Sequence, residues 1–279
     1  MPPETLFDIE PTSASRPESA DRLSRRLSRA MLQMVAAHGL LTAGDRVLVA
    51  VSGGKDSYTL LDLLERARRR SPVPFEIVAW HLDQGQPGYD GEPLRAWLER
   101  RAVPFEIHRE DTYRAVVAAS EPGETLCRVC SRLRRGILYA AAQRLGCNKI
   151  ALGHHRDDAL ETLLLNLLFA GRLQAMPARY RTNDGRFEVI RPLLGCSERD
   201  IARHAVRAGY PIVPCNLCGS QPDRKRERVA RMLDDLEREI PNVREVMLAA
   251  LGNVRPSHLL DREVADAWEA AAPRFPPRR

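Results

Sequence analysis

Residues 47–57 read Val47-Leu48-Val49-Ala50-Val51-Ser52-Gly53-Gly54-Lys55-Asp56-Ser57, and this stretch decides the fold. The first five residues are apolar and mostly β-branched, which predicts a buried strand. Two glycines then permit a tight turn, and the chain continues into a helical run from Tyr58 to Arg66. Because the free N–H groups and the dipole of a helix N-terminus favour negative charge, this order of elements predicts an anion-binding site.

The turn carries several groups that bind phosphate. Its glycines let the backbone approach phosphate oxygens, its lysine supplies a positive charge, and its serines donate hydroxyl hydrogen bonds. The loop is not a Walker A motif, because Val49 stands where the first glycine should be and Asp56 replaces the Ser or Thr after the lysine. An ordinary glycine turn is the alternative interpretation, and the density of phosphate-binding groups favours the anion site.

The segment Ser52–Ser57 resembles the PP-loop of the N-type ATP pyrophosphatases, which bind ATP by its pyrophosphate end and adenylate a substrate. The resemblance implies an adenine nucleotide alpha hydrolase-like fold and catalytic roles for Lys55 and Asp56. It also implies that all six loop residues bind ATP: Ser52, Gly53, Gly54, Lys55, Asp56 and Ser57. Because the family includes tRNA thiolases, lysidine synthetases and GMP synthetases, this motif alone leaves the substrate open.

The composition narrows the class of protein. A chain of 279 residues can form a full core, and one α/β domain of about 200 residues with appendages is expected. No run of 18 apolar residues and no secretory apolar region occurs, so the sequence predicts a cytoplasmic protein without a membrane span. In that reducing compartment, six cysteines suggest metal or redox chemistry more than structural disulfides.

Strand-like and helix-like apolar patterns alternate along the chain. We expect strands at 47–51, 75–82, 105–108 and 149–153, a β excursion at 172–190, and helices at 20–38, 58–66, 95–101, 131–145, 157–170, 197–208, 224–240 and 243–251. This order predicts an α/β fold, a parallel sheet with helices on both faces. We divide the chain into a flexible leader (1–22), an ATP pyrophosphatase domain with an N-terminal helix and the cysteines (23–222), a C-terminal helical segment (223–262) and a tail (263–279).

Two CxxC pairs are the second chemical signal. Cys127 and Cys130 open the helix expected from Ser131, whose N-terminus would favour the thiolate form. Cys215 and Cys218 lie in an expected loop. Four thiolates can form a tetrahedral zinc site or hold an iron–sulfur cluster, and the spacing alone favours zinc.

Longer motifs narrow the substrate. They are Cys127-Arg128-Val129-Cys130, Gly153-His154-His155-Arg156-Asp157-Asp158-Ala159-Leu160-Glu161-Thr162, Pro214-Cys215-Asn216-Leu217-Cys218-Gly219-Ser220-Gln221 and Asn253-Val254-Arg255-Pro256-Ser257-His258-Leu259-Leu260-Asp261. These segments resemble the tRNA 2-thiocytidine synthetases of the TtcA type. The resemblance implies a homodimer that thiolates cytidine at position 32 of the tRNA anticodon loop after ATP adenylates the C2 oxygen. It also implies a [4Fe-4S] cluster held by Cys127, Cys130 and Cys218, with a cysteine desulfurase or sulfide as sulfur donor, and this reverses the preference for zinc.

Carboxylates are expected beside the PP-loop, at the edge where the parallel strands end. Asp56 and Asp157 could hold Mg2+ against the ATP phosphates, and we prefer Asp157 to Asp158 for this role and for catalysis. Asp157 and Asp158 could instead be N-terminal caps of their helix. His154 and His155 are interpreted as core or hinge residues more than as catalytic groups.

Expected roles can also be assigned to Leu82, Cys147 and Cys196. Leu82 ends the second expected strand, where adenosine lies if the chain follows its relatives, and its backbone is the expected adenine contact. Cys147 and Cys196 lie outside the motifs and are interpreted as packing residues.

Basic residues flank both cysteine pairs. They are Arg128, Arg132, Arg134 and Arg135 around the first pair, and Arg224, Lys225, Arg226 and Arg228 after the second. Each run could be a solvated helix face, but two runs beside cysteines favour a polyanionic partner such as tRNA. Two other functions remain open: a PP-loop thiolase or ligase for another nucleoside with structural zinc, and a non-catalytic zinc module that binds RNA. An intact PP-loop argues against the second of these.

Overall fold

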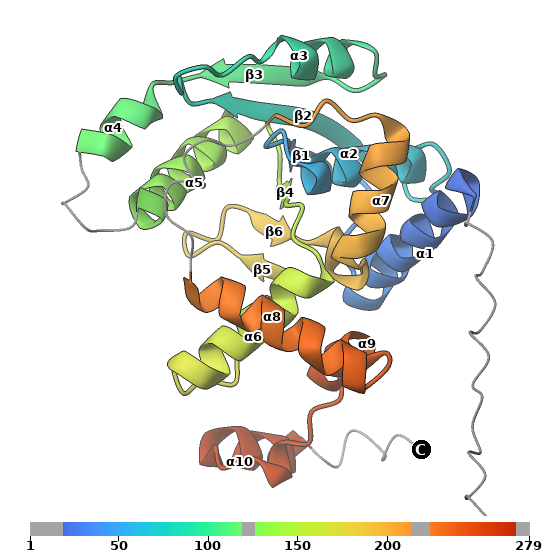
Figure 1. Ribbon diagram of the computed structural model, residues 1–279, viewed down its shortest axis with the longest axis vertical. Coiled ribbons are helices and arrows are strands. Elements are labelled where there is room, and N and C mark those ends of the chain that lie inside the picture. The colour runs from blue at the N-terminus through green and yellow to red at the C-terminus, as the bar shows by residue number, and fades with distance from the viewer. Residues whose placement is uncertain (1–18, 119–125, 214–223, 272–279) are drawn as a thin grey trace, which may run out of the picture.

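The computed structural model describes residues 19–118, 126–213 and 224–271, with only the backbone described for residues 20, 116–118, 126–131 and 224. Its centre is a six-stranded sheet with the strand order β3-β2-β1-β4-β6-β5 (Figure 1). The strands are β1 (Arg46–Ala50), β2 (Glu76–Asp83), β3 (Phe105–Arg109), β4 (Lys149–Ala151), β5 (Arg179–Arg181) and β6 (Glu188–Ile190).

Helices connect and cover these strands. They are α1 (Ala20–His38), α2 (Lys55–Arg68), α3 (Glu92–Glu99), α4 (Thr112–Ala118), α5 (Leu126–Arg144), α6 (Arg156–Phe169), α7 (Glu198–Ala208), α8 (Arg224–Glu239), α9 (Val243–Leu251) and α10 (Arg262–Ala271), with the short 3-10 helices η1 (Pro192–Gly195) and η3 (Pro256–His258).

All neighbouring strands are parallel except β5, which pairs antiparallel with β6 at the end of the sheet. The β1 strand lies between β2 and β4, with Val47 in register with both Ile77 and Lys149. Since β1, β2 and β4 all point the same way, the loops that follow them meet at one carboxyl edge. Ligands of open α/β sheets bind at this edge.

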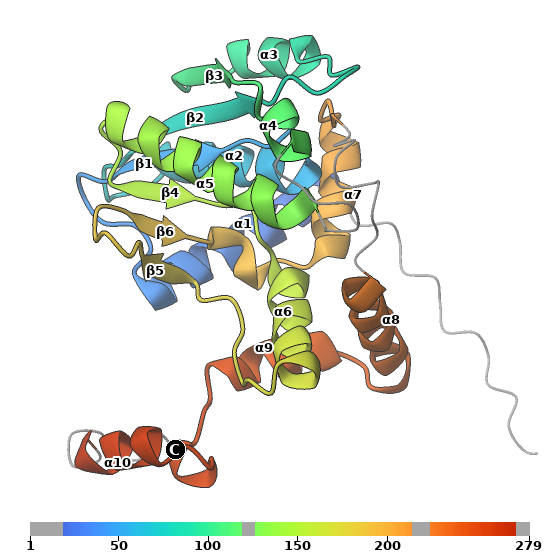
Figure 2. The ribbon, with the colours of Figure 1, turned by 90° about the vertical axis from the view of Figure 1, so that its left-hand side faces the viewer.

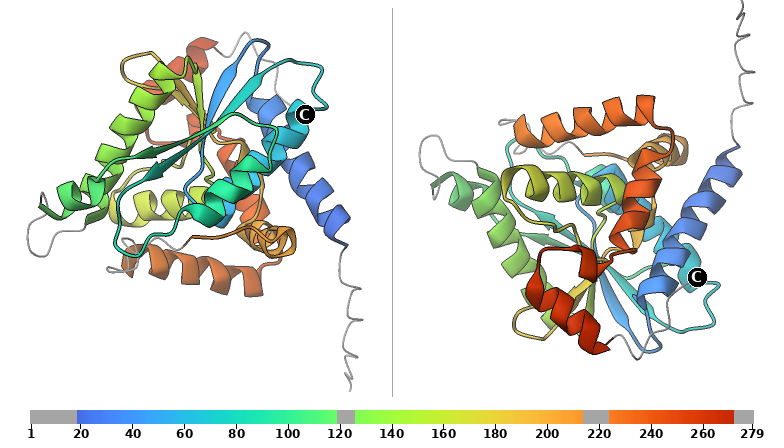
Figure 3. Two further views of the ribbon diagram at one scale, coloured as in Figure 1. Left: turned by 90° about the horizontal axis from the view of Figure 1, so that it is seen from above. Right: turned by 90° about the horizontal axis from the view of Figure 1, so that it is seen from below.

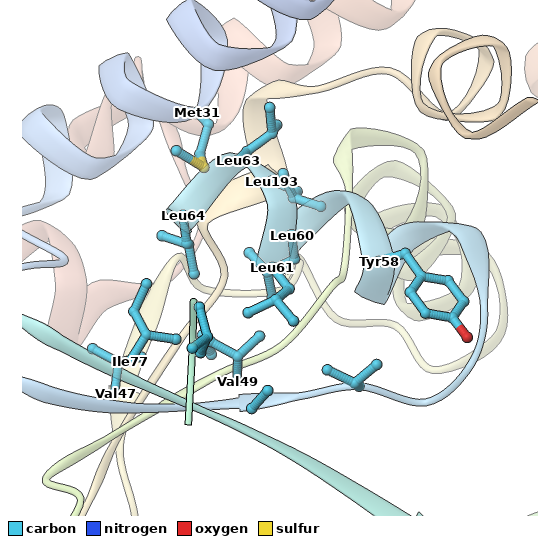
Figure 4. Close-up of a cluster of buried hydrophobic side chains, with 14 of the residues drawn as sticks. Met31, Val47, Val49, Tyr58, Leu60, Leu61, Leu63, Leu64, Ile77 and Leu193 are labelled. Atoms are coloured by element: carbon cyan, nitrogen blue, oxygen red, sulfur yellow. The ribbon is translucent and has the colours of Figure 1, made fainter. Parts of the chain in front are cut away.

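The two faces of the sheet are both covered by helices, as predicted. On one face the leucines of α2 pack against the apolar side chains of β1 and β2, with α1, α3 and α7 around them (Figure 4). On the other face Leu138, Ala141 and Ala142 of α5 cover Leu48 and Ile150 (Figure 2). The view along the layers shows the sheet between the two groups of helices (Figure 3, left).

The C-terminal helices form a second layer away from the sheet. Leu160 of α6 packs with Val229 and Leu233 of α8, next to α9 (Figure 3, right). Helix α10 lies within the range 263–279 that we expected to be a tail, apart from its first residue, and none of its described side chains is buried. No helix in the described ranges is long and apolar enough to cross a membrane.

Most element positions agree with the sequence analysis, and three helices differ by more than a few residues. Helix α10 lies in the expected tail, and helix α4 was not predicted at all. Helix α5 begins at Leu126 rather than near Ser131, so the first cysteine pair lies inside the helix and not ahead of it. Leu126, Val129 and Leu133 follow the helical apolar repeat, but the predicted helix was not extended back across the cysteine pair.

Candidate active site

The PP-loop residues lie between β1 and α2 at the carboxyl edge. Helix α2 begins at Lys55, before the predicted start at Tyr58, so the N–H groups of its first turn belong to the loop. Ser57 braces the turn: its hydroxyl accepts a hydrogen bond from the Ser52 N–H at 3.1 Å and donates one to the Gly54 carbonyl at 2.9 Å. The loop conformation is therefore held by the loop's own residues.

Two glycines allow close approaches around the loop. Gly53 has a φ of +86°, and its carbonyl accepts a hydrogen bond from the Val213 N–H at 3.0 Å. A Cβ atom at Gly153 would lie 3.1 Å from both the Asp56 carbonyl carbon and the Ser57 nitrogen. Only glycine therefore lets the loop after β4 pack so closely against the start of α2.

The ammonium group of Lys55 is bound by two carboxylates. It lies 3.3 Å from Asp56 Oδ2 and 2.9 Å from Glu198 Oε1. Burial lowers the pKa of Lys55, but the hydrogen bond to Glu198 and the neighbouring negative charges outweigh it and raise the pKa. Lys55 is thus a fixed positive charge. Glu198 is the first residue of α7, and sequence reasoning missed it because no motif surrounds it.

Asp56 has a buried oxygen without a hydrogen bond. This oxygen, Oδ1, accepts no hydrogen bond from any described residue. It lies 3.3 Å from the Lys55 Nζ in an ion pair and 3.7 Å from His155 Nε2. Burial raises the pKa of Asp56, and the charge of Asp158 adds to this effect, while Lys55 and His155 oppose it. A bound cation would satisfy this oxygen.

The structure places Asp157 and Asp158 differently. Asp157 is buried; its Oδ1 accepts a hydrogen bond from Arg244 at 2.7 Å and its Oδ2 accepts one from the Glu198 N–H at 2.7 Å. Asp158 Oδ2 lies 3.5 Å from His155 Nε2, the same nitrogen that faces Asp56. Asp56 and Asp158 therefore share His155 Nε2 as a neighbour, whereas both carboxylate oxygens of Asp157 are already hydrogen-bonded.

Comparison with known proteins decides the family. Residues 23–214 match the family model of the PP-loop domain. The tRNA-cytidine(32) 2-sulfurtransferase of Anaeromyxobacter dehalogenans is 53% identical over 243 residues, which cover 87% of this chain and 84% of that protein. A protein of the same name from Verminephrobacter eiseniae is 47% identical over 262 residues, 94% of this chain and 83% of the relative. The chain belongs to the tRNA-cytidine(32) 2-sulfurtransferase family.

This membership confirms the family and the enzyme class predicted from the sequence, a sulfurtransferase with a PP-loop domain. Among solved structures, the U34-tRNA thiolase NcsA from Methanococcus maripaludis with its [4Fe-4S] cluster has a TM-score of 0.65 and 19% identity, covering 90% of this chain and 89% of that chain. At that identity the likeness concerns the fold, and it agrees with the predicted α/β class.

The two histidines of the sulfurtransferase motif have structural partners. His155 is the N-cap of α6: its Nδ1 accepts a hydrogen bond from the Asp158 N–H, and the Asp158 carboxylate accepts one from the His155 N–H. Arg191 Nε lies 3.3 Å from His154 Nδ1. Burial, with the charge of Arg191, lowers the pKa of His154 to about 4, so this imidazole is neutral at pH 7.

The end of β2 lies beside a polar cavity. Leu82 is buried next to Asp83, the last residue of the strand. A cavity of about 320 Å³ begins at Asp83 and continues past Tyr89 to the start of α3. His81 bonds the Val51 carbonyl at 2.7 Å, which ties β2 to the residue before the PP-loop. The adenine contact at Leu82 stays a prediction.

The cysteine motifs of the sulfurtransferase family lie partly within the described residues. Cys127 and Cys130 are in the first turns of α5, which starts at the carboxyl edge because it leads back into β4. Cys215 and Cys218 lie outside the described residues. Val213, the last described residue before this cysteine pair, donates its N–H to the Gly53 carbonyl.

Helix α8, which follows the second cysteine pair, is also close to the site. Arg226 of α8 lies 2.7 Å from Glu161 and 3.5 Å from Asp158. Arg226, from the second basic run, therefore lies beside the carboxylates at the carboxyl edge.

Proposed function

We propose that the chain catalyses the ATP-dependent 2-thiolation of cytidine at position 32 of tRNA in the cytoplasm. The observation that carries the proposal is the meeting of two loops at one edge of the sheet, where Lys55, Asp56 and Asp158 converge in a member of the sulfurtransferase family. A homodimer and an external sulfur donor, a cysteine desulfurase or sulfide, are part of the proposal.

The residues of the PP-loop suit adenylation. The N–H groups at the start of α2 and the charge of Lys55 would bind the ATP phosphates and stabilise the departing pyrophosphate. The C2 oxygen of cytidine attacks the α-phosphate, which converts this oxygen into an AMP leaving group. Hydrosulfide then adds at C2, and AMP departs with the former C2 oxygen.

The first cysteine pair fits a thiolate-bound cluster. Cys127 and Cys130 are three residues apart in the first turns of α5, and CxxC is a common spacing of thiolate ligands. A helix N-terminus lowers the pKa of thiols and so favours the ligating thiolate. We propose that Cys127, Cys130 and Cys218 hold a [4Fe-4S] cluster. When bound, a cluster with three protein ligands would supply the sulfur nucleophile.

The buried oxygen of Asp56 that accepts no hydrogen bond fits a magnesium ion, since Mg2+ binds one or two carboxylates together with phosphate oxygens. We propose Asp56 and Asp158 as its ligands. Asp157, our sequence-based choice, is committed to Arg244 and to the Glu198 N–H. Its proposed role is to position the first turn of α7, and with it the Glu198 carboxylate that bonds Lys55.

Replacing Asp158 by Asn should raise the Mg2+ concentration for half-maximal AMP formation by about 10-fold, the scale on which the loss of a supporting group weakens a metal site. Asp157→Asn is the matched control. It should leave that concentration unchanged but lower the free energy of unfolding by about 3 kcal/mol, because it breaks the buried pair with Arg244. Urea unfolding measures the free energy of unfolding, and a magnesium titration of AMP formation measures the half-maximal Mg2+ concentration. If Asp157→Asn raised the half-maximal Mg2+ concentration and Asp158→Asn did not, Asp157 would be the ligand.

The bond of ATP that is cleaved tests the proposed function directly. With an unmodified tRNA transcript and ATP, the holoenzyme should release AMP and pyrophosphate and introduce one sulfur at cytidine 32. A transcript with uridine at that position is the control and should not be thiolated. Formation of ADP and phosphate would contradict the proposal, and thiolation at a different nucleoside would favour the other PP-loop function.

A further inference from the structure

Helices α1 and α7 carry a basic surface that no motif of the sequence indicated. Its arginines are Arg22, Arg25, Arg26 and Arg29 on α1, and Arg199, Arg203 and Arg207 on α7. All are exposed except Arg203, whose side chain is 39% exposed. We call this set, with Asp21 and Asp200 among it, the α1–α7 surface. Its net charge of +5 compares with +6 for the whole chain, so the remainder of the chain is nearly neutral.

The arginines of each helix follow the helical repeat and form two neighbouring rows. Arg199, Arg203 and Arg207 are each four residues apart, which corresponds to steps of about 6 Å along one helix face. The helices lie side by side (Figure 1). Arg26 joins them through two bonds to Asp200, at 3.1 Å and 2.6 Å. The rows are therefore fixed relative to each other.

Most of this positive charge is not neutralised. Within the described ranges of the chain, Arg22, Arg29, Arg199 and Arg207 form no ion pair, and Arg203 reaches Asp200 only at 3.8 Å. Arginines that serve the fold look different: Arg101 is bonded to Asp62 at 2.6 Å and to Glu65 at 2.9 Å, both buried. Rows of like charge without matching carboxylates destabilise a surface slightly, so folding does not explain them.

The α7 row starts at the candidate active site. Glu198, which is bonded to Lys55, directly precedes Arg199, and α7 then runs over α2 beside α1. We propose that the α1–α7 surface binds the phosphate backbone of the RNA substrate while the acceptor base occupies the site at the PP-loop. The proposal rests on the proposed function and specifies where the RNA lies.

The chemistry matches an RNA strand. Guanidinium groups bind phosphate by two parallel hydrogen bonds, and steps of about 6 Å along a helix are similar to the separation of successive phosphates. Such contacts supply affinity and position without reading sequence. In the basic run after the second cysteine pair, Arg226 is already bonded to Glu161 on α6.

The test replaces Arg199, Arg203 and Arg207 together by Gln, a good helix former that keeps α7 intact. The full-length holoenzyme should bind an unmodified tRNA transcript about 10-fold more weakly, and the slope of log K against log salt should fall by about one for each phosphate that these arginines neutralise. KM for tRNA should rise accordingly, while KM for ATP, iron content and kcat at saturating tRNA stay at wild-type values.

The matched control replaces three exposed arginines on other elements, Arg114→Gln, Arg181→Gln and Arg262→Gln, which removes the same net charge. This variant should keep the wild-type salt slope. An equal change of slope in both variants would show a general charge effect and overturn the proposal, as would an unchanged slope in the α7 variant. A wild-type protein that bound no tRNA would overturn the proposed function itself, which the AMP assay would show independently.

Discussion

Replacing Cys127, Cys130 or Cys218 by Ala should remove the bound iron and tRNA thiolation together. If three thiolates hold the cluster, the loss of one leaves too few ligands to retain it. The measurements are iron and sulfide content of protein purified without oxygen, its broad visible absorption, and thiolated cytidine in a tRNA transcript. ATP binding should persist, because the PP-loop is formed by β1 and α2. A colourless protein that contains zinc would instead favour the structural-zinc alternative.

The remaining cysteines provide the controls. Cys196 and Cys147 are 1% and 4% exposed, and burial raises the pKa of Cys196 to about 12, so this thiol stays protonated at neutral pH. Alanine at either position should keep the iron and lower stability by about 1 kcal/mol. Cys215→Ala should keep most of the iron. If Cys215→Ala loses the cluster and Cys218→Ala keeps it, the third ligand has been assigned to the wrong cysteine.

Replacing Lys55 by Ala should slow AMP formation by ~10²-fold or more, the scale expected when a preorganised charge is removed from the reacting phosphates. Lys55 is held in place by Glu198 and Asp56, and its pKa is raised, so it is charged throughout the neutral range. Single-turnover AMP formation with saturating ATP and tRNA is the measurement. A reduction below about 3-fold would show that the α2 N-terminus alone binds the phosphates.

Lys149 offers a control for structural damage. It is buried, 3.0 Å from both Asp45 and Glu188, and far from the PP-loop at the start of β4. Lys149→Ala should lower the free energy of unfolding by about 3 kcal/mol, because it leaves a buried carboxylate unpaired. The folded fraction should still form AMP at the wild-type rate. Lys55→Ala should show the reverse, a stable protein with slow chemistry.

The local apolar repeats and turn residues of the chain were sufficient to predict the fold class and the PP-loop. Strand β1 and helix α2 were predictable because buried strands and amphipathic helices have different apolar repeats, and because two glycines mark the turn between them. The alternation of strands and helices then required a parallel sheet covered on both faces. The start of α5 was misplaced because the cysteine pair was assigned to the turn ahead of the helix, although Leu126, Val129 and Leu133 already follow the helical repeat.

The partners of the catalytic groups depended on packing between distant segments. Asp157 and Asp158 are adjacent, so from sequence they are equivalent, but neighbouring helix residues point about 100° apart. The contact of Arg244 on α9 with α6 makes Asp157 part of a buried ion pair, whereas Asp158 lies beside His155, the residue that also neighbours Asp56. Glu198 reaches Lys55 because α7 packs against α2. Sequence alone determined most of the elements and the family, since these follow from local repeats and motifs. The tertiary structure decided which partners Lys55 and Asp157 have, because that depends on how helices far apart in the chain rotate and pack.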